Sequence, residues 1–360
     1  MLERLGWDSR RRAETFKKIL VPLDGSEQAR GILPYVSYLA KGMGSSLHIL
    51  LVINPDDVRI PGVARKAQSD CGAPMAVGYT GIVGAETDAG IAVETRRRFP
   101  TRVHEPGGPY VSQAFDRAES RLRRDLSWVV DDLAESGLKA RAAVRFGDAA
   151  EEIVRYAKKH ECDLIAMSTH GRNMVSRAIL GNITDSVIRT SDLPTLAITP
   201  EKAEQYWRSD VELTKILVPL DGSEMAEGAL PFAEELARTL SMEIVLVRAI
   251  GQTTLQSSDV ALFYAGDAGI DAEIEAEACA YLDSVVDKLS AKGLKVTCTF
   301  KRGVPAAAIN ELAHDTPDNV IALTTHGRSG FRRLALGSVT EAIVRNAGDS
   351  VLVIPPACSA

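Results

Sequence analysis

Short apolar runs alternate with longer stretches of helical periodicity along most of the chain. Lys18–Leu23 is a compact run rich in Ile, Leu and Val, and the polar turn that follows leads into residues spaced for a helix up to about Lys41. The expected strands of the first half are 18–23, 47–53, 140–146, 164–168 and 195–199, and its later helices are 117–136, 151–160 and 183–190. Apolar strands that alternate with helices are typical of a parallel sheet covered on both faces.

The same pattern occurs twice in the chain. Ten residues that begin at Lys18 recur unchanged from Lys215, and residue 215 against residue 18 is an offset of 197. Thr-His-Gly-Arg at 169–172 recurs at 325–328, an offset of 156. The first copy therefore carries 41 extra residues, the difference between the two offsets, and the repeated unit is the size of a domain.

We therefore predict two tandem doubly wound α/β domains, each with a five-stranded, mostly parallel sheet flanked by helices. The extra residues fall at about 54–116, a stretch rich in Gly, Pro and charge, for which we expect disorder, with a partly ordered lid as the alternative. The expected divisions are an N-terminal tail at 1–16, a first domain at 17–200, a linker at 201–213 and a second domain at 214–356.

Composition excludes several classes of protein. A formal net charge of −6 argues against a non-specific nucleic-acid binder, which would present a basic face. No apolar run approaches the roughly 20 residues that span a bilayer, and residues 1–18 lack the apolar segment of a signal peptide. We therefore expect no membrane partner and a cytoplasmic location. The five cysteines form no CxxC pair, which argues against a zinc site, and Cys162 and Cys298 are expected in the core.

The candidate ligand site lies where two segments of each repeat should meet. In a doubly wound sheet, ligands bind outside the carboxyl ends of the strands, at the switch in strand order. The first segment ends the first strand, and the second is the loop after the fourth strand with the start of the next helix. These residues are Pro22, Leu23, Asp24, Ser168, Gly171, Arg172, Gly181 and Asn182 in repeat one, and Pro219, Leu220, Asp221, Thr324, Gly327, Arg328, Gly337 and Ser338 in repeat two.

This arrangement predicts a cradle for a polyphosphate. Glycine lets a backbone approach a ligand closely, and the free N–H groups and dipole at a helix start favour an anion. The hydroxyl of Ser338 adds a donor. Asp24 and Asp221 have a second interpretation, since Asp before an apolar helix often serves only as its cap.

These residues closely resemble the universal stress protein family. The resemblance covers both repeats outside the insertion and is carried by the ILVPLDGSE opening together with the THGR…LG(S/N) signature. It implies an adenine nucleotide alpha hydrolase-like fold and ATP binding, with or without Mg²⁺. In ATP-binding members the phosphate motif is Gly-x2-Gly-x9-Gly-Ser/Thr, and a residue that ends the second strand lines the adenine pocket. That residue is Val52 in repeat one and Ala249 in repeat two.

Both repeats depart from the family motif. Its first glycine is Ser168 in one repeat and Thr324 in the other, and the final hydroxyl is kept as Ser338 but replaced by Asn182. We therefore rank the second site above the first. The resemblance implies a stress-response or signalling protein that binds an adenine nucleotide without strong turnover. A slow ATP hydrolase and a nucleotide-free interaction module remain the alternatives.

The last strand of each repeat suggests how the repeats assemble. Strands 195–199 and 351–354 would be exposed sheet edges, which proteins cover or pair. In the resembling family, single-domain members dimerise through these edges. We expect the two repeats to pair within one chain, and further dimerisation of the tandem stays open.

Overall fold

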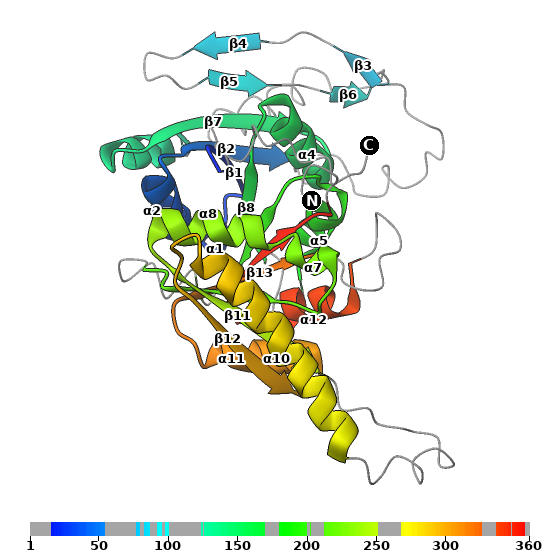
Figure 1. Cartoon of the computed structure of the whole chain (residues 1–360). Helices are drawn as coiled ribbons and strands as arrows, with labels where there is room; N and C mark the ends of the chain where they lie inside the picture. Colours follow the sequence, from blue (N-terminus) through cyan, green and yellow to red (C-terminus); the bar gives the residue numbers. More distant parts are fainter. Residues whose placement is uncertain are drawn as a thin grey trace.

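A single ten-stranded sheet with helices on both faces runs through the molecule (Figure 1). The computed structural model describes residues 16–54, 77–79, 83–86, 92–95, 98–100, 124, 126–169, 180–199, 202, 212–250, 268–325, 336–346 and 348–356. The strand order is β12-β11-β10-β13-β14-β9-β8-β1-β2-β7. Each half contributes five strands, parallel within the half and in the doubly wound order, so the predicted fold class is confirmed.

The two halves contain the same series of elements. Repeat one consists of β1 (Lys18–Leu23), α1 (Glu27–Arg30), α2 (Leu33–Met43), β2 (Ser46–Ile53), the helical residues 126–135, β7 (Lys139–Phe146), α4 (Ala149–Lys159), β8 (Leu164–Ser168), α5 (Asn182–Thr190) and β9 (Thr195–Ile198). Repeat two consists of β10 (Lys215–Pro219), α7 (Glu224–Glu227), α8 (Leu230–Leu240), β11 (Glu243–Ile250), α10 (Ala268–Ser290), β12 (Val296–Arg302), α11 (Pro305–His314), β13 (Asn319–Thr324), α12 (Ser338–Asn346) and β14 (Ser350–Ile354).

Four short strands occur within the predicted insertion. They form two antiparallel ribbons, of β3 (Val77–Tyr79) with β6 (Arg98–Pro100) and of β4 (Val83–Glu86) with β5 (Ala92–Thr95). Secondary structure is therefore present where the sequence showed no periodicity. The rest of the insertion lies outside the described residues.

The first predicted helix of each repeat is two helices. In repeat one the chain leaves α1 after Arg30 and begins α2 at Leu33, with Pro34 in the first turn. Proline has no N–H to donate to the preceding turn, and it fits the first turn of a new helix. Repeat two breaks in the same place, between α7 and α8, where Pro231 holds the equivalent position. The expectation of one continuous helix was wrong because it passed over these prolines.

The fourth strand of each repeat, β8 or β13, is buried along its whole length. This burial is expected for parallel strands covered on both faces. Cys162, just before β8, is buried as predicted. The prediction for Cys298 was wrong. Its strand, β12, is the edge strand of the sheet, so fewer neighbours cover it and Cys298 is exposed.

The two halves share one strand junction and one core. β9 and β14 pair antiparallel with Leu196 opposite Leu352, and this pairing makes two five-stranded sheets into one of ten. The main apolar cluster continues across the junction, where the ring centroids of Phe16 and Phe232 lie 5.9 Å apart. An ion pair of 2.8 Å between Lys202 Nζ and Asp349 Oδ1 crosses beside it, with both side chains largely buried.

This shared core predicts cooperative unfolding. Leu196 is 3% exposed, and replacing it with Ala should lower the free energy of unfolding by about 2–5 kcal/mol, the usual effect of a buried cavity. Urea denaturation followed by circular dichroism should give one transition at a lower midpoint, since the junction belongs to both repeats. Val304→Ala, at a side chain that is 70% exposed, is the control and should have little effect. Two separate transitions, only one of which moves, would contradict a shared core.

Candidate functional site

A cavity of about 410 Å³ lies at the carboxyl ends of β10, β11 and β13, against the start of α12. This volume is in the range of small-molecule sites. The described residues that line it are Pro219, Leu220, Asp221, Ala226, Val247, Arg248, Ala249, Ile250, Pro305, Ile309, Leu323, Thr324, Gly337, Ser338, Val339, Thr340 and Ile343. The structure therefore brings together seven predicted residues of repeat two, six from the two segments and Ala249 near the end of the second strand. Gly327 and Arg328 lie outside the described residues.

Asp221 closes the turn that forms one wall of this cavity. Its Oδ1 accepts hydrogen bonds from the backbone N (2.9 Å) and the Oγ (2.6 Å) of Ser223, and Ser223 Oγ accepts from Ala226 N at 3.1 Å to cap α7. The N-cap of α7 is therefore Ser223 and not Asp221, and Asp221 instead fixes the turn that holds Ser223 in place. A ligand-binding role is compatible with it, because the same turn faces the cavity.

The opposite wall is the start of α12. Gly337 N donates to Thr325 O at 2.7 Å, and Gly337 O accepts from Glu341 N at 2.8 Å as the first turn forms. The amides of the first helical residues, Ser338 onward, precede this first intrahelical bond. They give the cavity a helix N-terminus, which favours an anion.

Sequence reasoning missed the threonines that fasten each helix start to the sheet. Thr340 Oγ1 donates to the carbonyl oxygen of Thr324 at 2.9 Å, and Thr184 Oγ1 donates to Ser168 O at 2.9 Å in repeat one. Both threonines are buried and lie three residues after the last motif glycine. Their identical position in the two repeats was the signal that could have revealed them.

Repeat one has the same framework. Pro22 and Leu23 end β1, and Asp24 follows them with its Oδ1 accepting a hydrogen bond from Ser26 N at 2.8 Å. Val52 is near the end of β2, Ser168 ends β8, and Gly181 and Asn182 begin α5. A Cβ built on Gly181 would lie 2.9 Å from Thr169 O, so a larger residue would displace the helix start from the strand. Gly171 and Arg172 lie outside the described residues.

The sequence model of the universal stress protein family matches residues 95–199 and 212–355. The chain belongs to the universal stress protein family. Universal stress protein MJ0577 of Methanocaldococcus jannaschii is 28% identical over 151 residues, which are 39% of this chain and 93% of that protein. Universal stress protein Slr1230 of a Synechocystis species is 23% identical over 343 residues, 93% of this chain and 99% of that protein.

A solved universal stress protein from Archaeoglobus fulgidus has the same tandem fold. It aligns with a TM-score of 0.58 at 18% identity and covers 95% of this chain and 97% of its own.

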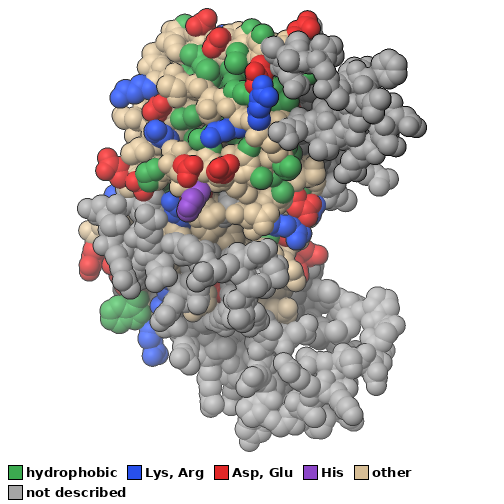
Figure 2. Space-filling model, turned by 90° about the horizontal axis from the view of Figure 1, so that it is seen from below, with side chains coloured by type: hydrophobic (Ala, Val, Ile, Leu, Met, Phe, Trp, Pro, Cys, Tyr) green, Lys and Arg blue, Asp and Glu red, His purple; other side chains and the backbone are tan. Residues whose placement is uncertain are grey.

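Acidic and basic side chains are interspersed over the described part of the face in Figure 2, in keeping with the mild net charge. Among the described residues, no helix is long and apolar enough to cross a membrane.

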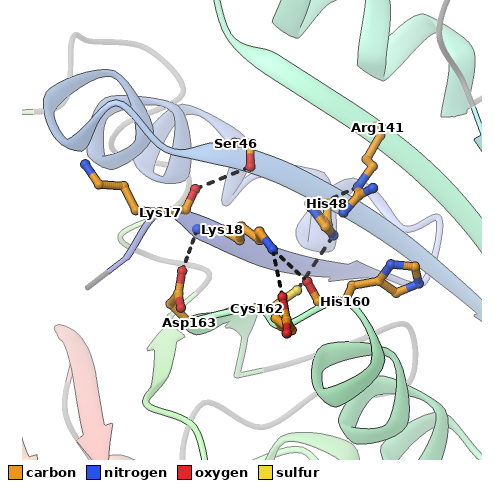
Figure 3. Close-up of polar contacts among 9 residues, drawn as sticks. Lys17, Lys18, Ser46, His48, Arg141, His160, Cys162 and Asp163 are labelled. Atoms are coloured by element: carbon orange, nitrogen blue, oxygen red, sulfur yellow. Dashed lines mark hydrogen bonds and ion pairs between the residues drawn. The ribbon is translucent and has the colours of Figure 1, made fainter. Parts of the chain in front are cut away.

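In this universal stress protein, repeat one also holds a buried polar cluster at the amino ends of its strands, away from the nucleotide-site motifs (Figure 3). Arg141 Nε donates to His48 Nε2 at 2.8 Å, so the other ring nitrogen of His48 carries the proton and faces Cys162 Sγ at 3.7 Å. Repeat two has Val245, Thr297 and Asp318 at the positions of these three residues.

The cluster is poorly suited to acid–base or nucleophilic chemistry. Burial, together with the positive charge of Arg141, lowers the pKa of His48 to about 3, so the ring stays neutral near pH 7. Burial raises the pKa of Cys162 to about 12, which keeps it a thiol. No group of three His, Cys, Asp or Glu side chains within the described residues is arranged to hold a metal ion.

The buried histidine predicts a specific loss of stability in acid. Because the pKa of His48 is about 3 in the folded chain and about 6.5 when unfolded, only the unfolded state takes up its proton between these values. Stability should therefore fall as pH drops below about 6.5, by about 2–3 kcal/mol from this residue at pH 4.5. Urea titrations at pH 7.5 and pH 4.5 measure the effect.

The double variant His48→Val, Arg141→Thr, which copies repeat two, should lose that part of the pH dependence. His314 is exposed, so His314→Gln is the control and should keep it. If the double variant kept the full pH dependence, His48 would not be the cause of the loss of stability in acid.

Proposed function

We propose that the chain binds ATP, with or without Mg²⁺, first of all in the cavity of repeat two, and serves as a stress-response or signalling protein without strong catalytic turnover. The observation that carries this proposal is the single cavity that joins Asp221, Ala249 and the Gly337–Ser338 helix start. These are the positions that the family resemblance assigns to the nucleoside and the phosphates.

The chemistry of the walls matches the two ends of the nucleotide. The start of α12 and the Ser338 hydroxyl suit phosphate oxygens, because both offer donors where the helix dipole is positive. Val247, Ala249 and Ile309 form an apolar wall that suits an adenine ring. Asp221 can accept hydrogen bonds from hydroxyl or amino groups of the nucleoside.

The structure also has room for Thr324, which stands where the family motif has its first glycine. A Cβ built on Gly228 would lie 3.4 Å from the Thr324 Cγ2, so the absent side chain of Gly228 leaves room for this methyl group. Thr324 uses its carbonyl to hold Thr340. A threonine in place of the family's first glycine is therefore compatible with a nucleotide in the cavity.

The alternative functions rest on different features. Hydrolysis requires a base and a metal ligand near the phosphates, and Asp221 is the only acidic residue among the described residues that line the cavity. This disfavours an ATP hydrolase. A nucleotide-free module is a better alternative for repeat one, where Asn182 replaces the phosphate-binding hydroxyl.

We further propose that the two repeats remain paired through β9 and β14 in solution. Supporting this, the register has three opposed residue pairs and the apolar cluster is continuous across the junction. The two candidate nucleotide sites then belong to one rigid body. Further dimerisation of the tandem remains open.

Nucleotide binding is tested by native mass spectrometry of the chain with millimolar ATP, with and without Mg²⁺. We expect one or two bound ATP molecules and the loss of one in Gly337→Leu, whose side chain would fill the helix start. Gly181→Leu is the matched variant and should remove only the nucleotide of repeat one. Retention of all ATP by Gly337→Leu, or no binding to the parent chain, would refute the proposal. Phosphate release above background would favour the hydrolase.

The Ser338 hydroxyl provides a finer test. Ser338→Ala should weaken ATP binding about tenfold, the usual effect of one hydrogen bond to a charged group. Titration calorimetry in the Gly181→Leu background isolates the site of repeat two. A Ser338→Ala variant with unaltered affinity would place the phosphates elsewhere.

In the Gly337→Leu background, which isolates the site of repeat one, Asn182→Ser restores the family hydroxyl and should strengthen ATP binding.

A further inference from the structure

Arg248 lines the cavity at a place distant in sequence from the phosphate motif. It lies on β11, directly before Ala249, and is the only Lys or Arg among the described residues that line the cavity. The helix start of α12 already provides an anion site. An arginine in the lining of the same cavity therefore requires its own explanation.

The guanidinium of Arg248 is held beside the Asp221 turn. Its Cζ lies 5.3 Å from the centre of the Tyr281 ring, a cation–π distance. Tyr281 is fixed in turn by a 2.9 Å hydrogen bond from its hydroxyl to Glu227 Oε1. A Cβ built on Gly222 would lie 2.6 Å from Arg248 Nη1, so the guanidinium packs directly against this turn.

Repeat one shows that the fold does not require this arrangement. Leu51 holds the position of Arg248 and is 3% exposed, and Arg30 holds the position of Glu227. The Asp-Gly-Ser turn itself is the same, with a left-handed glycine in both repeats, at φ 79° for Gly25 and 85° for Gly222. At this position, therefore, repeat two has a guanidinium and repeat one has a leucine.

The position of Arg248 indicates what it would recognise. Asp221 is on the wall assigned to the nucleoside, and Arg248 lies beside its turn. In nucleoside sites an acidic residue binds a free ribose hydroxyl, whereas an arginine nearby accommodates a phosphate carried by the ribose. A planar guanidinium suits such a group because it can donate two parallel hydrogen bonds to it. The 5′ phosphates would remain at the helix start.

We propose that Arg248 is a specificity-determining residue, and that it makes the cavity of repeat two prefer adenine nucleotides that carry a phosphate on the ribose as well as at the 5′ position. This inference rests on the proposed nucleotide function. It names a ligand class for the cavity of repeat two, and it predicts no such preference for the site of repeat one, where Leu51 replaces the arginine.

Competition binding in the Gly181→Leu background tests the inference. A fluorescent ATP analogue reports the site, and the competitors are 5′-AMP, adenosine 3′,5′-bisphosphate and adenosine 2′,5′-bisphosphate. We expect at least one bisphosphate to compete about tenfold better than AMP, and the advantage to shrink as salt is raised. Equal competition by all three would overturn the inference.

Variants separate recognition from folding. Arg248→Leu, which copies repeat one, should reduce the ratio of bisphosphate to AMP affinity to about one, whereas Arg248→Lys should retain part of it. The ratio is compared at matched thermal stability, so a general loss of structure, which weakens all competitors alike, does not mimic the effect. A ratio unchanged in Arg248→Leu would overturn the inference.

The converse variant, Leu51→Arg with repeat two blocked by Gly337→Leu, checks whether the guanidinium alone transfers the preference. If the parent chain fails to bind the ATP analogue at all, the proposed nucleotide function fails first. Binding of the analogue without any preference for a bisphosphate refutes only the role of Arg248.

Discussion

The parallel pairing of the first and fourth strands of each repeat is the constraint on which the site depends. β10 and β13 pair with Lys215 opposite Asn319, so their carboxyl ends reach the same edge of the sheet. This register sets the Asp221 turn beside the helix start at Gly337, although the two are more than a hundred residues apart in sequence. Buried apolar side chains along both strands keep the register in place, since a shift by one residue would turn them to the opposite face.

The sequence was sufficient to predict most of this framework. The alternation of strands and helices predicted the doubly wound order, and the ten-residue identity with the two-glycine motif after the fourth strand predicted six residues of the cavity. Each of these sequence motifs lies within a short stretch of the chain, and each occurs in both repeats. The family resemblance then supplied the roles of Asp221, Ala249 and Ser338, which remain proposals for this chain.

What the sequence could not predict depends on tertiary neighbours. Cys162 lies beside an apolar strand and Cys298 lies within one, so the sequence suggests burial for both. Cys298 is exposed because its strand, β12, is at the edge of the sheet. Arg248 is a charged residue within an otherwise apolar run, 244–250, and its guanidinium is held by Tyr281, more than thirty residues later. The partners of His48 come from two other elements, so the cluster could not be seen along the chain.

Duplication has allowed the two halves to diverge around a common scaffold. Repeat one carries a buried polar cluster that repeat two lacks, and repeat two carries a guanidinium in its cavity where repeat one has leucine. The antiparallel junction of β9 and β14 joins both into one sheet, so each half can change its site while the core stays shared.

A crystal structure of the chain grown with a non-hydrolysable ATP analogue tests the central claim most directly. The account predicts that the analogue occupies the cavity of repeat two, with its phosphates at the amides of Ser338 and Val339 and its adenine against Ala249. An empty cavity at millimolar analogue, or a nucleotide whose phosphates lie away from the start of α12, would contradict it.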